Sequence, residues 1–277
     1  MITQENLQSF ADHLRLEERS ALTVEKYLRD VKKFLDFAGG ELPSKDLTLR
    51  YKHHLMEKGY ALRSVNSMLA ALNCFLSFSG YEACKVKSLK HQHEVYRPEA
   101  KELTKGEYLR LVRTSGARGE KRLQLVLQTI CLTGIRVSEL RYFTVEAARE
   151  GTIRVSCKNK TRTILLPGKL RKLLLSYAKG KGIASGPIFI TKTGRPLDRS
   201  NIWSKMKQLC REACVLPSKV FPHNLRKLFA RIFYGLEKDI AKLADVLGHS
   251  SIETTRIYIM TTGAEHRKNL DRLCLLL

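Results

Sequence analysis

The spacing of hydrophobic residues predicts a helical N-terminal region. In TVEKYLRDVKKFLDFAGG, apolar side chains from Val24 to Ala38 recur at i, i+3, i+4 and i+7, while lysines and arginines occupy the other face. The two glycines that follow end this helix. Similar patterns cover residues 49–58 and 62–78. Residues 1–84 are therefore expected to form a small helical bundle with basic outer faces.

A polar, basic stretch without apolar periodicity follows and predicts a linker over residues 85–101. Thr104 and Glu107 then match a capping box, in which each side chain binds the backbone N–H of the other residue. A helix is expected to begin directly after Thr104. We therefore place a second domain at residues 102–277.

The second domain has a mixed pattern, which predicts helices and a few strands. GTIRVSCKNKTRTILLP alternates like two strands around a polar tip at residues 158–161, and a further short strand is expected at 187–190. Trp203 is expected in the core. The predicted fold class is mainly α with a small antiparallel β-sheet: a helical N-terminal domain, then an α+β domain. Apolar helical patterns cover residues 123–132, 170–178 and 201–214.

The composition favours a polyanionic partner. Of the 277 residues, 50 are Lys or Arg and 27 are Asp or Glu, which gives a net charge of +23. Such an excess favours nucleic acid over an anionic membrane surface, and the alternative is a basic surface kept for solubility. The sequence has neither a long apolar run nor a secretory signal, so we expect no membrane contact and a cytoplasmic, nucleoid-associated protein.

The seven cysteines do not predict a metal site. Cys210 and Cys214 are spaced for one helix face, but no second Cys or His pair stands near them to complete a zinc site. We expect reduced thiols.

Two motifs of the second domain place arginines beside other polar residues. TGIRVSEL puts Arg136 just after a Thr-Gly break, with Glu139 three residues later. FPHNLRK places His223 and Arg226 on one helix face. Taken alone, the first is compatible with a helix start that carries an ion pair, and the second with an ordinary surface pair.

A third motif, LGHSSIETTRIY, places His249 between two helices. Gly248 ends the first helix, and Ser250 and Glu253 match a capping box that starts the second. Tyr258 then lies about two turns into that helix. A hinge histidine and a helical tyrosine are, each alone, most often structural.

Together these residue types match the needs of phosphodiester transfer. Guanidinium groups bind phosphoryl oxygens in pairs and stabilise their charge. A tyrosine can be the covalent nucleophile, although a phenol with a pKa near 10 needs a base or a cationic environment. A lysine can protonate the leaving 5′ oxygen, and the hairpin tip offers Lys158 and Lys160.

These motifs, in this order, resemble those of the tyrosine recombinases of the phage-integrase and Xer type. The resemblance covers nearly the whole chain, and the nine-residue step from His249 to Tyr258 is the family's spacing. It implies a SAM-like core-binding domain and a tyrosine recombinase catalytic domain that clamp double-stranded DNA, with no metal or nucleotide cofactor.

The resemblance also implies a role for each site residue. Arg136 and Arg226 would hold the scissile phosphate. His223 would assist proton removal from the tyrosine, and His249 would donate a hydrogen bond to a phosphate oxygen. Tyr258 would attack to form a 3′-phosphotyrosyl bond and free a 5′-hydroxyl, and Glu139 would support the site.

The hairpin departs from the family pattern. Relatives read like G-K-G-N-K-x-R, whereas this chain reads CKNKTR and is one residue shorter. We align Lys158 with the first family lysine and keep Lys160 as the alternative. Lys227 stands where many relatives carry a histidine, which leaves its local partners open.

The resemblance implies a homo-oligomer: a dimer on one site with two inverted half-sites and a tetramer in the synapse. The apolar stripe of Leu270, Leu273, Leu276 and Leu277 is expected on a terminal helix that docks on a neighbouring protomer or on its own domain. No arm-binding domain is expected ahead of the core-binding helices. The alternatives are a type IB topoisomerase-like relaxase and a non-catalytic DNA-binding protein on a recombinase fold.

Overall fold

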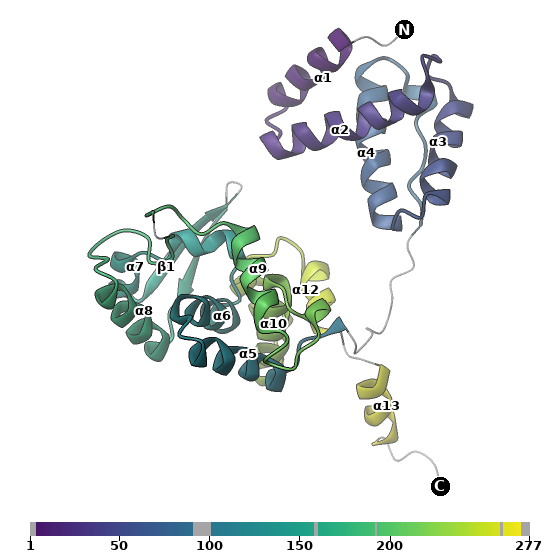
Figure 1. The fold of residues 1–277 in the computed structure, drawn as a ribbon. Helices are drawn as coiled ribbons and strands as arrows, with labels where there is room; N and C mark the ends of the chain where they lie inside the picture. The colour runs from purple at the N-terminus through teal and green to yellow at the C-terminus, as the bar shows by residue number, and fades with distance from the viewer. Residues whose placement is uncertain (1–3, 91–100, 158–159, 192, 261–262, 273–277) are drawn as a thin grey trace. The chain divides into compact units, whose positions relative to one another are not determined.

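The computed structural model describes residues 4–90, 101–157, 160–191, 193–260 and 263–272. The chain divides into two compact units, Met1–His93 and Glu94–Leu277 (Figure 1). The predicted fold class is confirmed, because the described parts are mainly helical and contain a two-stranded antiparallel sheet. Among the described residues, none of the helices combines the length and apolar character that a membrane span requires.

The N-terminal unit is a helical bundle whose ends are fixed by local caps. Gly39, at φ 57°, ends the second helix as predicted. The third helix begins earlier than the predicted 49, because the Ser44 side chain accepts a hydrogen bond from the N–H of Leu47 (3.1 Å) and so caps it. The elements are α1 (Gln4–Leu16), α2 (Ala21–Ala38), α3 (Lys45–Glu57), α4 (Leu62–Phe78) and the 3₁₀ helix η1 (Glu82–Cys84).

The chain that leaves this bundle is first held against α4. The Asn73 side chain donates to the carbonyl of Val86 (2.8 Å) and accepts from its N–H (3.0 Å). Asn66 binds the backbone of Leu89 in the same way, at 2.9 and 2.7 Å. Residues 85–90 of the predicted linker therefore follow the helical unit closely.

The C-terminal unit is built around α6, which packs against α5, α8 and α10 (Figure 1). Its core is apolar and continuous from α5 to the first turns of α10. The elements are α5 (Lys105–Ala117), α6 (Lys121–Thr133), the 3₁₀ helix η3 (Val137–Tyr142), α7 (Val145–Glu150), β1 (Thr152–Cys157), β2 (Lys160–Leu165), α8 (Gly168–Gly180), α9 (Arg199–Leu209), the 3₁₀ helix η4 (Pro217–Lys219), α10 (Pro222–Glu237), α11 (Ile240–Leu247), α12 (Ile252–Ile259) and α13 (Gly263–Asp271).

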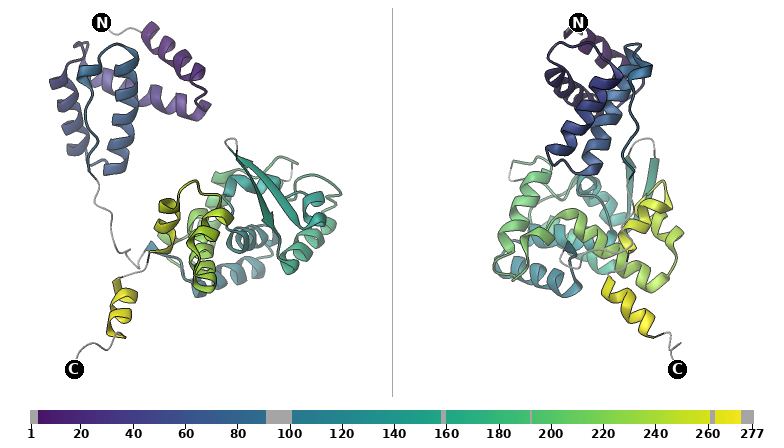
Figure 2. Two further views of the ribbon diagram at one scale, coloured as in Figure 1. Left: turned by 180° about the vertical axis from the view of Figure 1, so that it is seen from behind. Right: turned by 90° about the vertical axis from the view of Figure 1, so that its right-hand side faces the viewer.

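The predicted hairpin is present as β1 and β2, which project from the helical body of this unit (Figure 2). The register pairs Cys157 with Lys160 and Val155 with Arg162. Val155 and Ile164 are buried in the core, so one face of the hairpin is anchored there up to the Val155–Arg162 pair. The Thr104–Glu107 capping box that starts α5 is likewise confirmed.

Three local predictions in this unit are wrong. Trp203 is 49% exposed rather than in the core, and Lys207 lies over its ring, 5.1 Å from the centroid. The helix itself ends at Leu209, earlier than predicted, although Cys210 is still buried. In place of the strand expected at 187–190, the structure has isolated β-bridges at Pro187 and Ile190.

Candidate functional site

The first predicted site arginine follows the end of α6. Gly134 ends that helix at φ 63°, and a Cβ there would lie 2.3 Å from the ring of Phe229, so only glycine fits. Arg136 comes directly before η3. Glu139 accepts hydrogen bonds from the Arg136 backbone N–H (2.8 Å) and from its Nη1 (3.0 Å). The structure therefore contains the helix start and the ion pair with which the motif alone is compatible.

The second arginine, Arg226, is 1% exposed in the first turns of α10. Its Nη1 donates to the carbonyl of Gly134, and its Nη2 donates to the carbonyl of Leu247 (2.7 Å) and approaches Nε2 of His249 (2.9 Å). These contacts tie α10 to the ends of α6 and α11. Pro222 stands at the start of α10, where its missing N–H costs nothing.

The charge of Arg226 is not matched by a carboxylate among these partners. Burial, with the positive charge of Arg136, lowers the pKa of Arg226 to about 10, so the group stays protonated at neutral pH. Its Nε is buried and has no hydrogen-bond partner among the described residues. A buried cation in this state favours binding of an anion.

His249 lies between α11 and α12, as predicted. Burial lowers the pKa of His249 to about 4, and Arg226 and Arg136 add to the effect, so the ring is neutral at pH 7. A guanidinium can only donate, so Nε2 accepts from Arg226, and Nδ1 carries the proton and donates to Thr255 Oγ1 (2.9 Å). The ring is thus held from both sides.

Tyr258 lies on α12 against both histidines. Its ring centroid is 5.1 Å from that of His223 and 5.0 Å from that of His249, and the residue is 7% exposed. The cap of α12 is Ser251, whose Oγ accepts from the N–H of Glu253 (3.2 Å). The predicted cap at Ser250 is therefore wrong by one residue.

The structure brings the predicted site residues together, apart from the two candidate hairpin lysines. Lys158, the lysine chosen from the sequence, lies outside the described residues, and Lys160 is described only as the first residue of β2. We name the rest of the group the Tyr258 cluster: Arg136, Glu139, His223, Arg226, His249 and Tyr258.

Two residues of this site were not predicted from the sequence. Thr255, fully buried, holds His249. Arg162 on β2 forms an ion pair with Glu139 (2.6 Å) and donates to the carbonyl of Val246. The arginine of the family's K-x-R pattern marked the position of Arg162 but did not indicate its contacts. A single buried threonine in a helix, such as Thr255, has no recognisable signal in the sequence.

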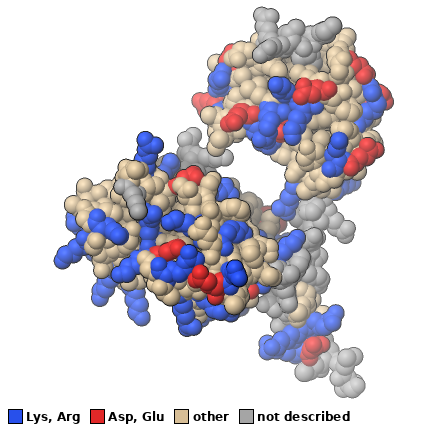
Figure 3. Space-filling view, in the orientation of Figure 1, with Lys and Arg blue, Asp and Glu red and all other residues tan. Residues whose placement is uncertain are grey.

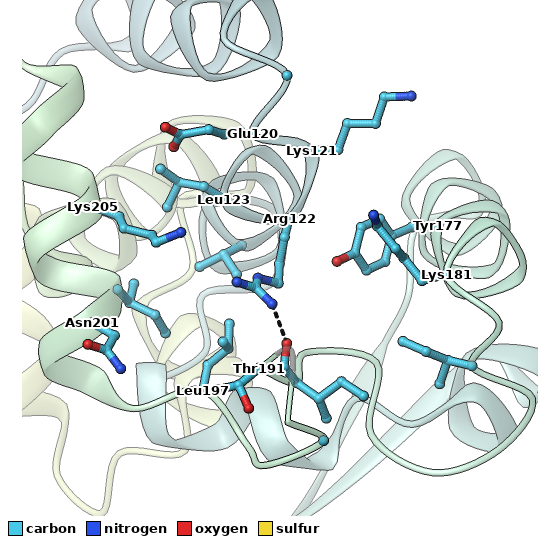
Figure 4. A pocket seen from close by; sticks show the side chains of 16 residues that line it. Glu120, Lys121, Arg122, Leu123, Tyr177, Lys181, Thr191, Leu197, Asn201 and Lys205 are labelled. Carbon is cyan, nitrogen blue, oxygen red and sulfur yellow. Dashed lines mark hydrogen bonds between the residues drawn. The ribbon is translucent and has the colours of Figure 1, made fainter.

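A basic cavity of about 750 Å³ lies elsewhere in the same unit (Figure 4). It opens between the start of α6, the end of α8 and α9, and shares no residue with the Tyr258 cluster. Arg122 crosses it to donate to the carbonyl of Ile190 (2.5 Å). We name it the α6 pocket, because the start of α6 forms part of its wall. Its cationic lining residues are Lys121, Arg122, Lys181 and Lys205. On the face in Figure 3, lysines and arginines are also spread over both units.

Comparison with known proteins decides the family. The model of the phage integrase family matches residues 101–265, and the model of the phage integrase N-terminal SAM-like domain matches residues 7–82. The chain belongs to the phage integrase family of tyrosine recombinases. The matched ranges contain the Tyr258 cluster and the helical bundle, respectively.

Curated relatives are similar over their whole length. Tyrosine recombinase XerA of Pyrococcus furiosus is 30% identical, and the similarity spans 99% of this chain and 96% of the relative. Tyrosine recombinase XerD of Halalkalibacterium halodurans is 29% identical over 95% of both chains.

Solved structures share the fold. A lambda integrase dimer bound to a COC′ core site superposes with a TM-score of 0.74 at 16% identity, covering 95% of this chain and 97% of that one. The Tn1549 transposon integrase in complex with circular intermediate DNA gives 0.73 at 17% identity, covering 97% and 99%.

Proposed function

We propose that the Tyr258 cluster cleaves and rejoins strands of double-stranded DNA as a site-specific recombinase. One observation carries the assignment of residues: a tyrosine ring packs against two imidazoles beside a buried guanidinium that has no carboxylate partner among the described residues. This arrangement offers a nucleophile and a place for a phosphate. The family membership and the net charge of +23 support duplex DNA as the partner.

In the proposed reaction, the Tyr258 oxygen attacks the phosphorus while the bond to the 5′ oxygen breaks. Arg136 and Arg226 stabilise the charge on the non-bridging oxygens. His223 assists removal of the phenol proton, and a hairpin lysine, Lys158 or alternatively Lys160, donates a proton to the leaving oxygen. The products are a 3′-phosphotyrosyl bond and a 5′-hydroxyl, and attack by a 5′-hydroxyl of another strand reverses the step.

His249 has a more specific part in this proposal. In the free protein its Nε2 accepts from Arg226 and therefore cannot donate to a phosphate oxygen. A bound phosphate attracts both the guanidinium and a proton, so His249 becomes a donor when the site is filled. Proton uptake is thus part of DNA binding.

The remaining parts of the proposal concern assembly and place of action. We expect a dimer on a site with inverted half-sites and a tetramer at synapsis, with the protein acting on nucleoid DNA in the cytoplasm. The α13 segment would dock on a neighbouring protomer; Leu270 is 51% exposed, and the other leucines of the stripe lie outside the described residues. The domain limits of 1–84, 85–101 and 102–277 also remain predictions.

The experiment is a covalent-capture selection. Nicked duplexes with a random segment are incubated with the full chain, and adducts that survive denaturation are sequenced. We expect one enriched sequence and an adduct on Tyr258, absent from Tyr258→Phe. Adding a second duplex with the same site separates a recombinase, which joins strands between duplexes, from a relaxase, which does not. Binding without any adduct would support the non-catalytic alternative.

A further inference from the structure

Arg162 connects the hairpin to Glu139 of the Tyr258 cluster and to the end of α11. Its side chain is only 13% exposed, and its two terminal nitrogens bind different segments: Nη2 forms the 2.6 Å ion pair with Glu139, and Nη1 donates to the carbonyl of Val246 at the end of α11. A Cβ on Gly248 would lie 2.6 Å from Cδ of Arg162, so the glycine before His249 leaves room for this side chain. Three separate segments therefore meet at one guanidinium.

Glu139 is shared between two arginines. Its carboxylate is 3% exposed; Oε1 accepts from Arg136 and Oε2 from Arg162. The backbone N–H of Arg136 also donates to Oε2 (2.8 Å). A buried carboxylate with charge-assisted bonds on both oxygens has little freedom to move. Arg162 is thus attached to a carboxylate that Arg136 holds independently, through its own backbone N–H and its Nη1.

The hairpin needs such an anchor near its tip. An isolated two-stranded hairpin is marginally stable in water. The core holds this one through the Ile153–Ile164 pair at its base and through Val155, which is the strand partner of Arg162. Closer to the tip, the hydroxyl of Tyr142 donates to the carbonyl of Ser156 on β1 (2.7 Å). Along β2 from the base towards the tip, Arg162 is the last residue whose described side chain has a buried partner.

The register places both candidate lysines close to this anchor along the chain. Lys160 occupies the position two residues before Arg162 on β2, about 7 Å away along a strand. In the sequence, Lys158 stands four residues before Arg162. Holding Arg162 therefore restricts the part of the chain that carries both lysines.

We propose that Arg162 is a positioning residue that holds the hairpin lysine in place to protonate the leaving 5′ oxygen. Arg162 itself exchanges no proton. The bond changes remain those of the proposed function, on which this inference rests: the P–O5′ bond breaks, the Tyr258 O–P bond forms, and the lysine ammonium gives its proton to the 5′ oxygen.

The test compares two leaving groups on the DNA site obtained by the capture selection. One suicide duplex carries the normal 5′ oxygen at the scissile phosphate, and the other carries sulfur there. A thiol has a pKa of about 8.5, so a thiolate leaves without a proton donor. A defect in proton delivery is therefore rescued by sulfur, whereas a defect in binding the phosphate is not.

We expect Arg162→Ala to slow cleavage of the oxygen substrate about 100-fold, which is the low end of what general acid catalysis contributes. On the sulfur substrate, the cleavage rate of this variant should stay within about 3-fold of the rate of the unsubstituted chain. Arg162→Lys keeps the charge but cannot bridge two acceptors with a planar fork, so the same pattern is expected with a smaller loss. Arg154→Ala is the matched control, because Arg154 is an exposed arginine on β1, paired with Thr163. It should cleave both substrates like the unsubstituted chain.

Other outcomes overturn the inference in distinguishable ways. Equal loss on both substrates, as expected for Arg226→Ala, would mean that Arg162 acts on the phosphate and not through the lysine. Unchanged cleavage of the oxygen substrate by both Arg162 variants would remove its role altogether. If the unsubstituted chain forms no Tyr258 adduct on either substrate, the proposed function itself fails, and the inference fails with it.

Discussion

The Tyr258 cluster and the α6 pocket are both basic, but they hold their charges in opposite ways. In the cluster, Arg226 is 1% exposed and bound by backbone carbonyls and His249. In the pocket, Lys121 and Lys205 are exposed, and the only fixed cation we identify among the described lining residues is Arg122 (Figure 4). Fixed, desolvated charge suits stabilisation of one transition state, whereas solvated, mobile charge suits general attraction of a polyanion. The difference predicts that substitutions in the cluster change rates and those in the pocket change affinity.

The largest effect is expected for Tyr258→Phe. It removes the nucleophilic oxygen but keeps the ring that packs against His223 and His249. Adduct formation should fall by at least about 10⁴-fold, because no other group in the cluster replaces a covalent nucleophile. DNA affinity, measured by titration at fixed salt, should stay within about 2-fold. Adduct formation by this variant would mean that another residue is the nucleophile.

Arg226→Lys should have the next largest effect. A lysine keeps the charge but loses the fork that reaches both Gly134 and Leu247. Cleavage of bound DNA should slow about 10²- to 10³-fold, as when one preorganised donor is removed from an active site. Thermal unfolding serves as the control. A rate close to that of the unsubstituted chain would show that rigid geometry at this position is unimportant.

The pH dependence of DNA binding tests the state of His249. With its pKa lowered to about 4 in the free protein, against about 6.5 unfolded, the neutral ring stabilises the fold above pH 6.5, and this contribution is lost as the pH falls towards 4. A bound phosphate should raise the pKa again. Binding near pH 6 should therefore take up protons, measured by calorimetry in buffers of different ionisation enthalpy. The uptake should decrease in His249→Asn; identical uptake would assign it elsewhere.

The smallest effect on rate is expected in the α6 pocket. Lys121→Gln with Lys205→Gln removes two exposed charges and leaves the Tyr258 cluster intact. Each lysine that contacts a phosphate should reduce the log–log salt slope of binding by about 1. The cleavage rate of the bound complex, measured with saturating protein, should not change. A lower rate in this complex would remove the distinction between the two regions.

The sequence predicted the parts of the site that local rules control. Gly134 and Gly248 end helices where left-handed backbone is needed, and Tyr258 lies on the helix that begins shortly after His249. The contacts that make Arg226 special could not be predicted, because its partners are backbone carbonyls far away in sequence. Pattern alone says nothing about them.

The errors have similar local causes. Two serines stand side by side before α12, and spacing to Glu253 favoured Ser250, whereas the helix is capped by Ser251. Trp203 has the helical spacing of a core residue, but a large ring can also lie on the surface when a lysine covers it. The segment at 187–190 is apolar enough for a strand and yet forms single bridges only.

The anchoring of Arg226 has a consequence for the field in the active site. Gly134 caps α6 and Leu247 is the last residue of α11, so the guanidinium faces the carboxyl ends of two helices. Such ends carry roughly half a negative charge each, made of aligned peptide dipoles. Dipoles solvate a nearby cation, but their potential decays faster with distance than that of a full counter-charge. The arginine is therefore tolerated inside the protein while its attraction still extends to an incoming phosphodiester.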